Sequence, residues 1–173
     1  MLCPRCASPA SRLQQYAGGC AYFVKGGPTD LPKVIPVTRR FLEEDRAASR
    51  VTTLVGDMIA DGPAGTYEVA VRRNLNQVLS LADAQAVVRR VGQSLAQNGP
   101  ILIIGRMMED NRLEPPSFAG QNLVFLNIYD EGLIYTKGEY RGLLVGAGFI
   151  DIVNSNRATP HCALVLKSGW PPE

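Results

Sequence analysis

The stretch from Ser80 to Ile104 constrains the fold of this 173-residue chain more than any other part. Its apolar residues recur at steps of three and four and predict a helix with one apolar face. That face consists of Leu81, Ala84, Val88, Val91 and Leu95. Ser80-Leu-Ala-Asp83 is a capping-box variant at the start, and Asn98-Gly99-Pro100 ends the helix. The apolar run Ile101–Ile104 follows at once and is typical of a strand covered on both faces by helices.

Short apolar runs and helical patterns alternate along the rest of the chain as well. The other predicted strands are Val51–Val55, Tyr67–Val71, Phe149–Val153 and Ala163–Leu166. We expect the last two to pair as a hairpin at the sheet edge. A helix is predicted after Pro115-Pro116, and Thr136-Lys-Gly-Glu139 is a second capping box, opening a short helix that stops at Gly148. This alternation indicates an α/β fold with a largely parallel sheet.

The chain divides by composition into three segments. Residues 1–29 are rich in Gly, Pro, Ser and Cys without sustained periodicity, which predicts an irregular segment. Residues 30–167 carry the α/β pattern, and residues 168–173 form a tail.

Charge and hydropathy exclude several partners. The net charge is only +2, which argues against a nucleic-acid partner, and no apolar run approaches the roughly 20 residues that a membrane span needs. Four cysteines are too sparse for a disulfide scaffold and are more natural in a reducing compartment, so we expect a cytoplasmic protein.

A metal site is not expected. Cys3 and Cys6 have the spacing of a zinc knuckle, but a second pair of ligands is missing. Cys20, His161 and Cys162 could complete such a site only if the fold brought them close. We interpret His161, the only histidine, as a loop residue.

Two acidic signatures lie in the first third of the chain: Asp30-Leu31-Pro32, and Gly56-Asp57-Met58 after the apolar run 51–55. In open α/β sheets, ligands bind where strands hand over to the next element, and a carboxylate there can accept hydrogen bonds from ribose hydroxyls or an adenine amine. Three alternatives stay open: Asp30 could cap a helix, Asp57 could start a turn, and Met58 could fill the core.

Five motifs occur in a fixed order: Asp30-Leu-Pro-Lys-Val-Ile, Arg50–Met58, Tyr67–Leu75, Gly99–Ile104 and Thr136–Phe149. Over residues 29–167 this order resembles the catalytic domain of S-adenosylmethionine-dependent O-methyltransferases of plant phenolic and bacterial secondary metabolism. The resemblance implies a Rossmann-like class I methyltransferase sheet, mostly parallel with a C-terminal antiparallel hairpin. It also implies S-adenosyl-L-methionine as the cofactor.

The resemblance implies a division of labour among the site residues. Asp30 would hold the ribose hydroxyls, and the Gly56-Asp57-Met58 motif would bracket the adenine. Arg73 matches a basic residue beside the cofactor, although a solvated charge at a strand end is the alternative reading.

On the acceptor side, Tyr129 and Asp130, with Glu131, match positions that line the acceptor pocket. The general-base histidine of the family's phenolic enzymes matches Gln77, and the carboxylate that orients this base matches Gly105. A carboxamide cannot take a proton at neutral pH. Gln77 is therefore expected to orient an acceptor that is already nucleophilic, with catalysis by positioning.

Two departures from the family pattern concern the start of the chain. The first strand and its Gly-rich loop are degenerate, and the family's N-terminal helical dimerisation domain is not matched, which predicts a monomer or weak oligomer.

We expect methyl transfer to a small aromatic or polyketide-like acceptor. The alternatives are a non-catalytic remnant of the fold or a binding module, and a zinc-dependent adaptor using Cys3 and Cys6.

Overall fold

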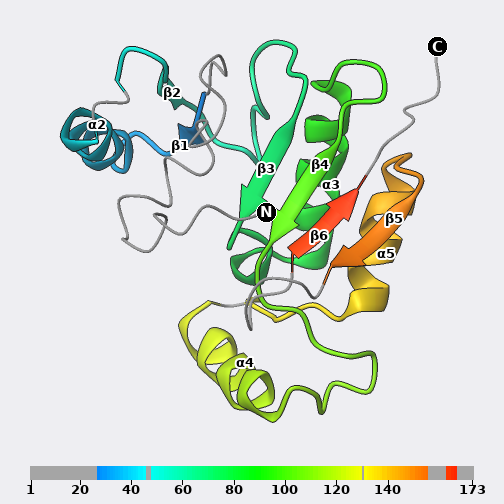
Figure 1. Cartoon of the computed structure of the whole chain (residues 1–173). Helices are drawn as coiled ribbons and strands as arrows, with labels where there is room; N and C mark the ends of the chain where they lie inside the picture. Colours follow the sequence, from blue (N-terminus) through cyan, green and yellow to red (C-terminus); the bar gives the residue numbers. More distant parts are fainter. Residues whose placement is uncertain (1–26, 46–47, 130, 156–162, 167–173) are drawn as a thin grey trace. The chain divides into compact units, whose positions relative to one another are not determined.

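A computed structural model describes residues 27–45, 48–129, 131–155 and 163–166 of the chain (Figure 1). The chain falls into two compact units, Met1–Pro63 and Ala64–Glu173, and each is described by itself.

The first unit contains a small β-α-β arrangement. Strand β1 (Thr29–Asp30) pairs in parallel with β2 (Leu54–Val55), and helix α2 (Ile35–Glu44) lies between them in sequence. Leu42 of α2 packs on Val51, and both side chains are buried. Of the strand predicted over residues 51–55, only Leu54–Val55 pairs with β1 among the described residues.

The second unit is built on a four-stranded sheet with the order β3-β4-β6-β5. Strand β3 (Ala70–Arg73) pairs in parallel with β4 (Ile101–Ile104), and β6 (Ala163–Leu166) runs antiparallel to both β4 and β5 (Ile152–Ser155). The prediction over residues 101–104 is confirmed. The segment that joins β5 to β6 lies outside the described residues.

Two further strands also differ from their predicted extents. The predicted strand Tyr67–Val71 begins only at Ala70, because β3 starts where its partner β4 starts, and Tyr67 instead makes a single bridge to Leu95. The predicted strand Phe149–Val153 begins at Ile152.

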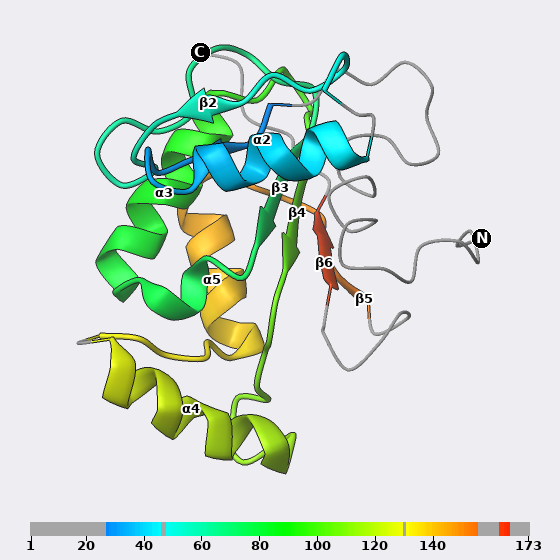
Figure 2. The ribbon, with the colours of Figure 1, turned by 90° about the vertical axis from the view of Figure 1, so that its left-hand side faces the viewer.

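Helices α3 (Leu81–Gln93) and α5 (Lys137–Gly146) lie on the same face of the sheet (Figure 2). Both helices and both predicted N-caps are confirmed: Ser80 accepts a hydrogen bond from the Asp83 amide, and Thr136 forms a full capping box. Four residues of the predicted apolar face are buried, namely Ala84, Val88, Val91 and Leu95, although Leu95 lies beyond the end of α3. The fifth, Leu81, opens the first turn of the helix and is 54% exposed.

Helix α4 (Pro116–Ile128) confirms the helix predicted after Pro115-Pro116 and lies beyond the carboxyl end of β4 (Figures 1 and 2). Phe118 is its only buried residue. Leu123, Leu126 and Ile128 are exposed, and the helix carries no charged side chain. In the described part of the chain, no helix has the length and apolar character to cross a bilayer.

Candidate functional site

The carboxyl ends of β1 and β2 bring the two acidic signatures together within the first unit. Asp30 is the last residue of β1 and stands opposite Val55. The Gly56 amide donates a 3.1 Å hydrogen bond to the Asp30 carbonyl, so Gly56 and Asp57 directly follow the paired strands. A methyl group on Gly56 would come within 3.2 Å of a Thr29 carbon, so there is little room for a side chain here. Adjacent carboxyl ends of parallel strands are the usual ligand position in open α/β sheets.

The carboxylate of Asp57 also organises its own loop. Its Oδ1 atom accepts hydrogen bonds from the Ile59 amide at 2.8 Å and the Ala60 amide at 3.3 Å, so Asp57 does start a turn. Asp30 Oδ1 accepts a 2.8 Å bond from the neighbouring Leu31 amide. A carboxylate has about four acceptor positions, so both groups keep capacity for a ligand.

Two of the three structural alternatives do not hold. Asp30 does not cap α2, whose N-cap is Val34 with no side-chain hydrogen bond. Met58 is half-buried and is not core filler. The chemistry of Asp30 and Asp57 fits the adenosine part of S-adenosylmethionine, since two half-buried carboxylates can accept hydrogen bonds from hydroxyl and amine groups. The segment in which we expect the family's first strand and Gly-rich loop to be degenerate falls largely in residues 1–26, outside the described residues.

In the second unit, Gln77 lies in a one-turn 3-10 helix, Asn76–Val78, directly after β3. The Gln77 side chain is 5% exposed, and a Cβ built on Gly105 would lie 3.6 Å from its Oε1 atom. The Asn74 amide donates a 2.9 Å hydrogen bond to the Ile104 carbonyl and holds the two strand ends together. Gln77 and Gly105, the two positions that depart from the family pattern, are therefore neighbours.

Arg73 is the last residue of β3 and is half-buried. Its neighbour Arg72 was missed by sequence reasoning. Arg72 is 5% exposed, and within the described part of the chain its three guanidinium nitrogens have no hydrogen-bond partner. Burial lowers the pKa of Arg72 to about 10. Side chains alternate along a strand, so Arg72 and Arg73 point to opposite faces of the sheet. The sequence alone does not show which of the two faces is buried.

Two tyrosines lie near the buried guanidinium of Arg72. Burial raises the pKa of Tyr135 to about 12, and burial also raises the pKa of Tyr140 above its ordinary value, while the charge of Arg72 opposes both shifts. A contact with the amide of Asn76 also opposes the shift of the Tyr140 pKa. Both phenols stay protonated at neutral pH, so neither supplies a general base.

Two neighbouring cavities lie at the start of α3. One of about 370 Å³ is lined in part by Ser80, Glu131 and Tyr135. The other, of about 520 Å³, shares Ser80 and Glu131 and is also lined by Tyr129. The Tyr129 ring stacks on Phe125 with 6.2 Å between centroids. Asp130 lies outside the described residues.

Among the described residues, no group of three or more His, Cys, Asp or Glu side chains could hold a metal ion. Cys3, Cys6, Cys20, His161 and Cys162 all lie outside them.

Comparison with known proteins gives a consistent result. Residues 22–150 match the family model of the O-methyltransferase domain. The chain is 28% identical over 123 residues to the tetracenomycin polyketide synthesis 8-O-methyl transferase TcmO of Streptomyces glaucescens, a match that covers 71% of this chain and 36% of that protein. It is 24% identical over 127 residues to the L-tyrosine C(3)-methyltransferase of Streptomyces lavendulae, covering 73% of this chain and 35% of that protein.

Among solved structures, human N-acetylserotonin methyltransferase in complex with SAM superposes with a TM-score of 0.79 at 19% identity, covering 92% of this chain and 45% of the human one. This likeness shows an α/β class I methyltransferase fold. The chain spans about a third of the length of the curated relatives it matches. The family match covers most of the sequence, and the chain belongs to the O-methyltransferase domain family.

Proposed function

We propose that this chain takes part in S-adenosylmethionine-dependent methyl transfer to a small aromatic or polyketide-like acceptor. The observation that carries the proposal is the pair of carboxylates, Asp30 and Asp57, at the adjacent carboxyl ends of β1 and β2 in a chain of the O-methyltransferase family. The name of the relative TcmO, a polyketide O-methyl transferase, supports the acceptor class.

Each cofactor-side residue has a role that its position supports. Asp30 accepts hydrogen bonds from the ribose hydroxyls, and Asp57 accepts one from the adenine amine with Met58 against the ring. Gly56 has no side chain that would crowd Thr29 at the end of β2. Arg73 contributes a positive charge at the end of β3. When bound, the cofactor supplies an electrophilic methyl group.

Gln77 has the chemistry of an orienting residue. Its carboxamide can donate and accept hydrogen bonds but does not take a proton at neutral pH. Positioning alone can contribute more to a rate than a general base, which typically contributes about 10²–10⁴-fold. The acceptor is therefore a group that is already nucleophilic, such as an ionised phenol or an enol carbon.

The cavities at the start of α3 suit an acceptor of this kind. Volumes of about 370 and 520 Å³ lie in the range of about 300–1,000 Å³ that is usual for small-molecule sites. Tyr129 offers an aromatic face and Glu131 a hydrogen-bond acceptor to the bound ring. Asp130 follows Tyr129 in sequence, and we include it in the acceptor side.

The proposal extends to the finer architecture. We infer a Rossmann-like class I methyltransferase architecture, mostly parallel, in which β5 and β6 form the C-terminal antiparallel hairpin. We also infer a monomeric or weakly associating chain in the cytoplasm, the compartment that sparse cysteines favour.

Calorimetric titration of the full chain with S-adenosylmethionine tests the proposal. Asp57→Asn is expected to weaken binding by about tenfold or more, because hydrogen bonds to a charged group contribute about 1.5–3 kcal/mol. Asp30→Asn is expected to act in the same direction. The matched control is Glu43→Gln, which removes an exposed carboxylate of the same unit and leaves the affinity unchanged.

A dissociation constant above the millimolar range for the unmodified chain would overturn the enzyme assignment and favour a non-catalytic member of the fold. Equal affinity of Asp57→Asn and the unmodified chain would overturn the assignment of Asp57.

A further inference from the structure

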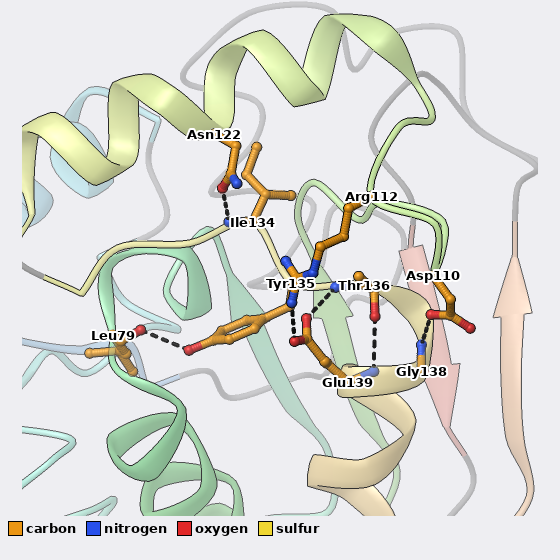
Figure 3. A network of polar contacts seen from close by, with 9 residues as sticks. All are labelled: Leu79, Asp110, Arg112, Asn122, Ile134, Tyr135, Thr136, Gly138 and Glu139. Carbon is orange, nitrogen blue, oxygen red and sulfur yellow. Dashed lines mark hydrogen bonds and ion pairs between the residues drawn. The ribbon is translucent and has the colours of Figure 1, made fainter.

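The turn that carries Gln77 is held by a separate segment of the chain. We define the strap as Gly132–Lys137, the last part of the connection from α4 to α5 together with the first residue of α5. The Leu133 amide donates a 3.0 Å hydrogen bond to the Gln77 carbonyl. The Tyr135 hydroxyl donates a 2.7 Å hydrogen bond to the Leu79 carbonyl (Figure 3). The strap thus binds carbonyl groups in the middle and at the end of the turn.

Close packing adds to these two hydrogen bonds. Gly132 is buried, and a Cβ on it would lie 3.1 Å from the Gln77 carbonyl oxygen and 2.7 Å from the Tyr129 Cβ. The backbone of the strap therefore lies directly against the turn. Tyr135 is 1% exposed, so its hydrogen bond to Leu79 is shielded from water.

The strap is itself fixed at several points away from the turn. The Ile134 amide donates a 2.8 Å hydrogen bond to Asn122 of α4. The Met108 amide donates to the Tyr135 carbonyl at 3.1 Å, and the Lys137 amide donates to the Met108 carbonyl at 2.9 Å.

The start of α5 holds the same segment from the other side (Figure 3). Glu139 accepts a 2.8 Å hydrogen bond from the Thr136 amide and forms an ion pair with Arg112. Asp110 accepts a 2.7 Å hydrogen bond from the Gly138 amide. A segment anchored on both sides can define the place of the turn that it contacts.

We propose that Tyr135 is a positioning residue, whose hydrogen bond to Leu79 keeps the carboxamide of Gln77 against Gly105 at the end of β4. The inference has two parts. The role of Gln77 in methyl transfer rests on the proposed function. The effect of the strap on the order of the turn does not, and it can be measured without any ligand.

The first experiment is amide hydrogen exchange on the unliganded full chain, comparing Tyr135→Phe with the unmodified protein. Exchange of the Val78 and Leu79 amides, which bond within the turn, is expected to accelerate about tenfold in Tyr135→Phe. Amides of α5 such as Leu144 are expected to keep their rates, which separates local opening from global destabilisation.

The matched control is Tyr67→Phe, which removes another phenol hydroxyl that donates to a backbone carbonyl, that of Ala64. It is expected to leave the Gln77 turn unchanged. The proposal is overturned if the turn amides keep their rates in Tyr135→Phe, or if both variants accelerate them equally.

The second experiment is a double-mutant cycle on turnover with Tyr135→Phe and Gln77→Ala. Tyr135→Phe is expected to lower kcat by about 10- to 100-fold while the affinity for S-adenosylmethionine stays the same. In the Gln77→Ala background the same change is expected to have no further effect, whereas independent, multiplying effects would refute positioning through Gln77. A chain that shows local opening of the turn but no cofactor binding would overturn the proposed function and leave the positioning by Tyr135 intact.

Discussion

At the scale of single residues, the Asp110 carboxylate, which accepts a hydrogen bond at the start of α5, makes the stability of the second unit depend on pH in acid. Its pKa lies below the ordinary value of 3.8, first because the Gly138 amide donates a hydrogen bond to it and then because the Thr136 side chain does. A depressed folded pKa gives stability that is present above the unfolded pKa and is lost as the pH falls through the folded value.

Asp110→Asn is therefore expected to lower stability at pH 7, because the neutral carboxamide accepts from Gly138 without the negative charge that strengthens the bond. The same change is expected to flatten the fall in stability below pH 3.8, since a carboxamide does not titrate there. Urea unfolding at a series of acid pH values measures this. Glu68→Gln, which alters an exposed carboxylate of the same unit, is the control and should keep the steeper acid fall. An equally steep fall in Asp110→Asn would contradict the prediction.

Arg72 is the second residue whose replacement should change the free energy of unfolding measurably. A buried cation without a partner among the described residues carries an uncompensated desolvation cost. Arg72→Met keeps an unbranched apolar stem and removes that cost, so we expect unfolding free energy to stay equal or to rise by about 1–4 kcal/mol. Chemical denaturation measures the change, with exposed Arg141→Met as the control. A loss of more than about 2 kcal/mol would mean that Arg72 has a strong partner.

At the scale of elements, the two helix caps of the second unit differ in a way that can be tested. Thr136 and Glu139 form both halves of a capping box, whereas Ser80 accepts from the Asp83 amide and donates its hydroxyl to the Asp83 carboxylate. Thr136→Ala is expected to destabilise the protein by about 1–2 kcal/mol, and Ser80→Ala by about 0.5–1 kcal/mol. Thermal and urea unfolding of the two variants give the comparison, and a larger loss in Ser80→Ala would contradict it.

Helix positions were predictable from sequence because caps and periodicity are local signals. The starts of α3, α4 and α5 follow the predicted signals at Ser80, Pro115-Pro116 and Thr136. The predicted end of α3 was wrong, because the helix stops at Gln93 and not at Asn98-Gly99-Pro100. Strand extents were less predictable, because β2 and β3 end where their partners end, and no local signal reports the length of a partner.

The same distinction applies to the candidate site. Asp30 and Asp57 could be found because each sits at a sequence signal for a strand end, and the parallel pairing of β1 and β2 then brings them together. Arg72 and the strap residue Tyr135 could not be found, since their importance comes from burial and from contacts between distant segments.

At the scale of the whole molecule, the two units differ in how much core their described residues bury. In the described part of the first unit the buried apolar side chains are Ile35, Leu42 and Val51, while the described residues of the second unit include many more across α3, α5 and β4. Fewer buried contacts mean a lower free energy of local opening. We expect the amides of α2 to exchange with solvent faster than those of α3.

Hydrogen exchange read out by mass spectrometry on the full chain checks this order and can be repeated with S-adenosylmethionine. On the proposed function, the cofactor should slow exchange at the loop that starts with Asp57 by binding the folded state. Slower exchange in α2 than in α3 without ligand would contradict the expectation.

The carboxamide of Gln77 beside Gly105 has a further consequence for the pH profile of turnover. A carboxamide has no proton to lose or gain between pH 5 and pH 9, and the tyrosines near Arg72 ionise only above that range. If the chain transfers methyl groups, the rise of kcat with pH belongs to the acceptor. Replacing one phenolic acceptor substrate by a more acidic one would then move the midpoint of the pH profile by the difference between the pKa values of the two acceptors.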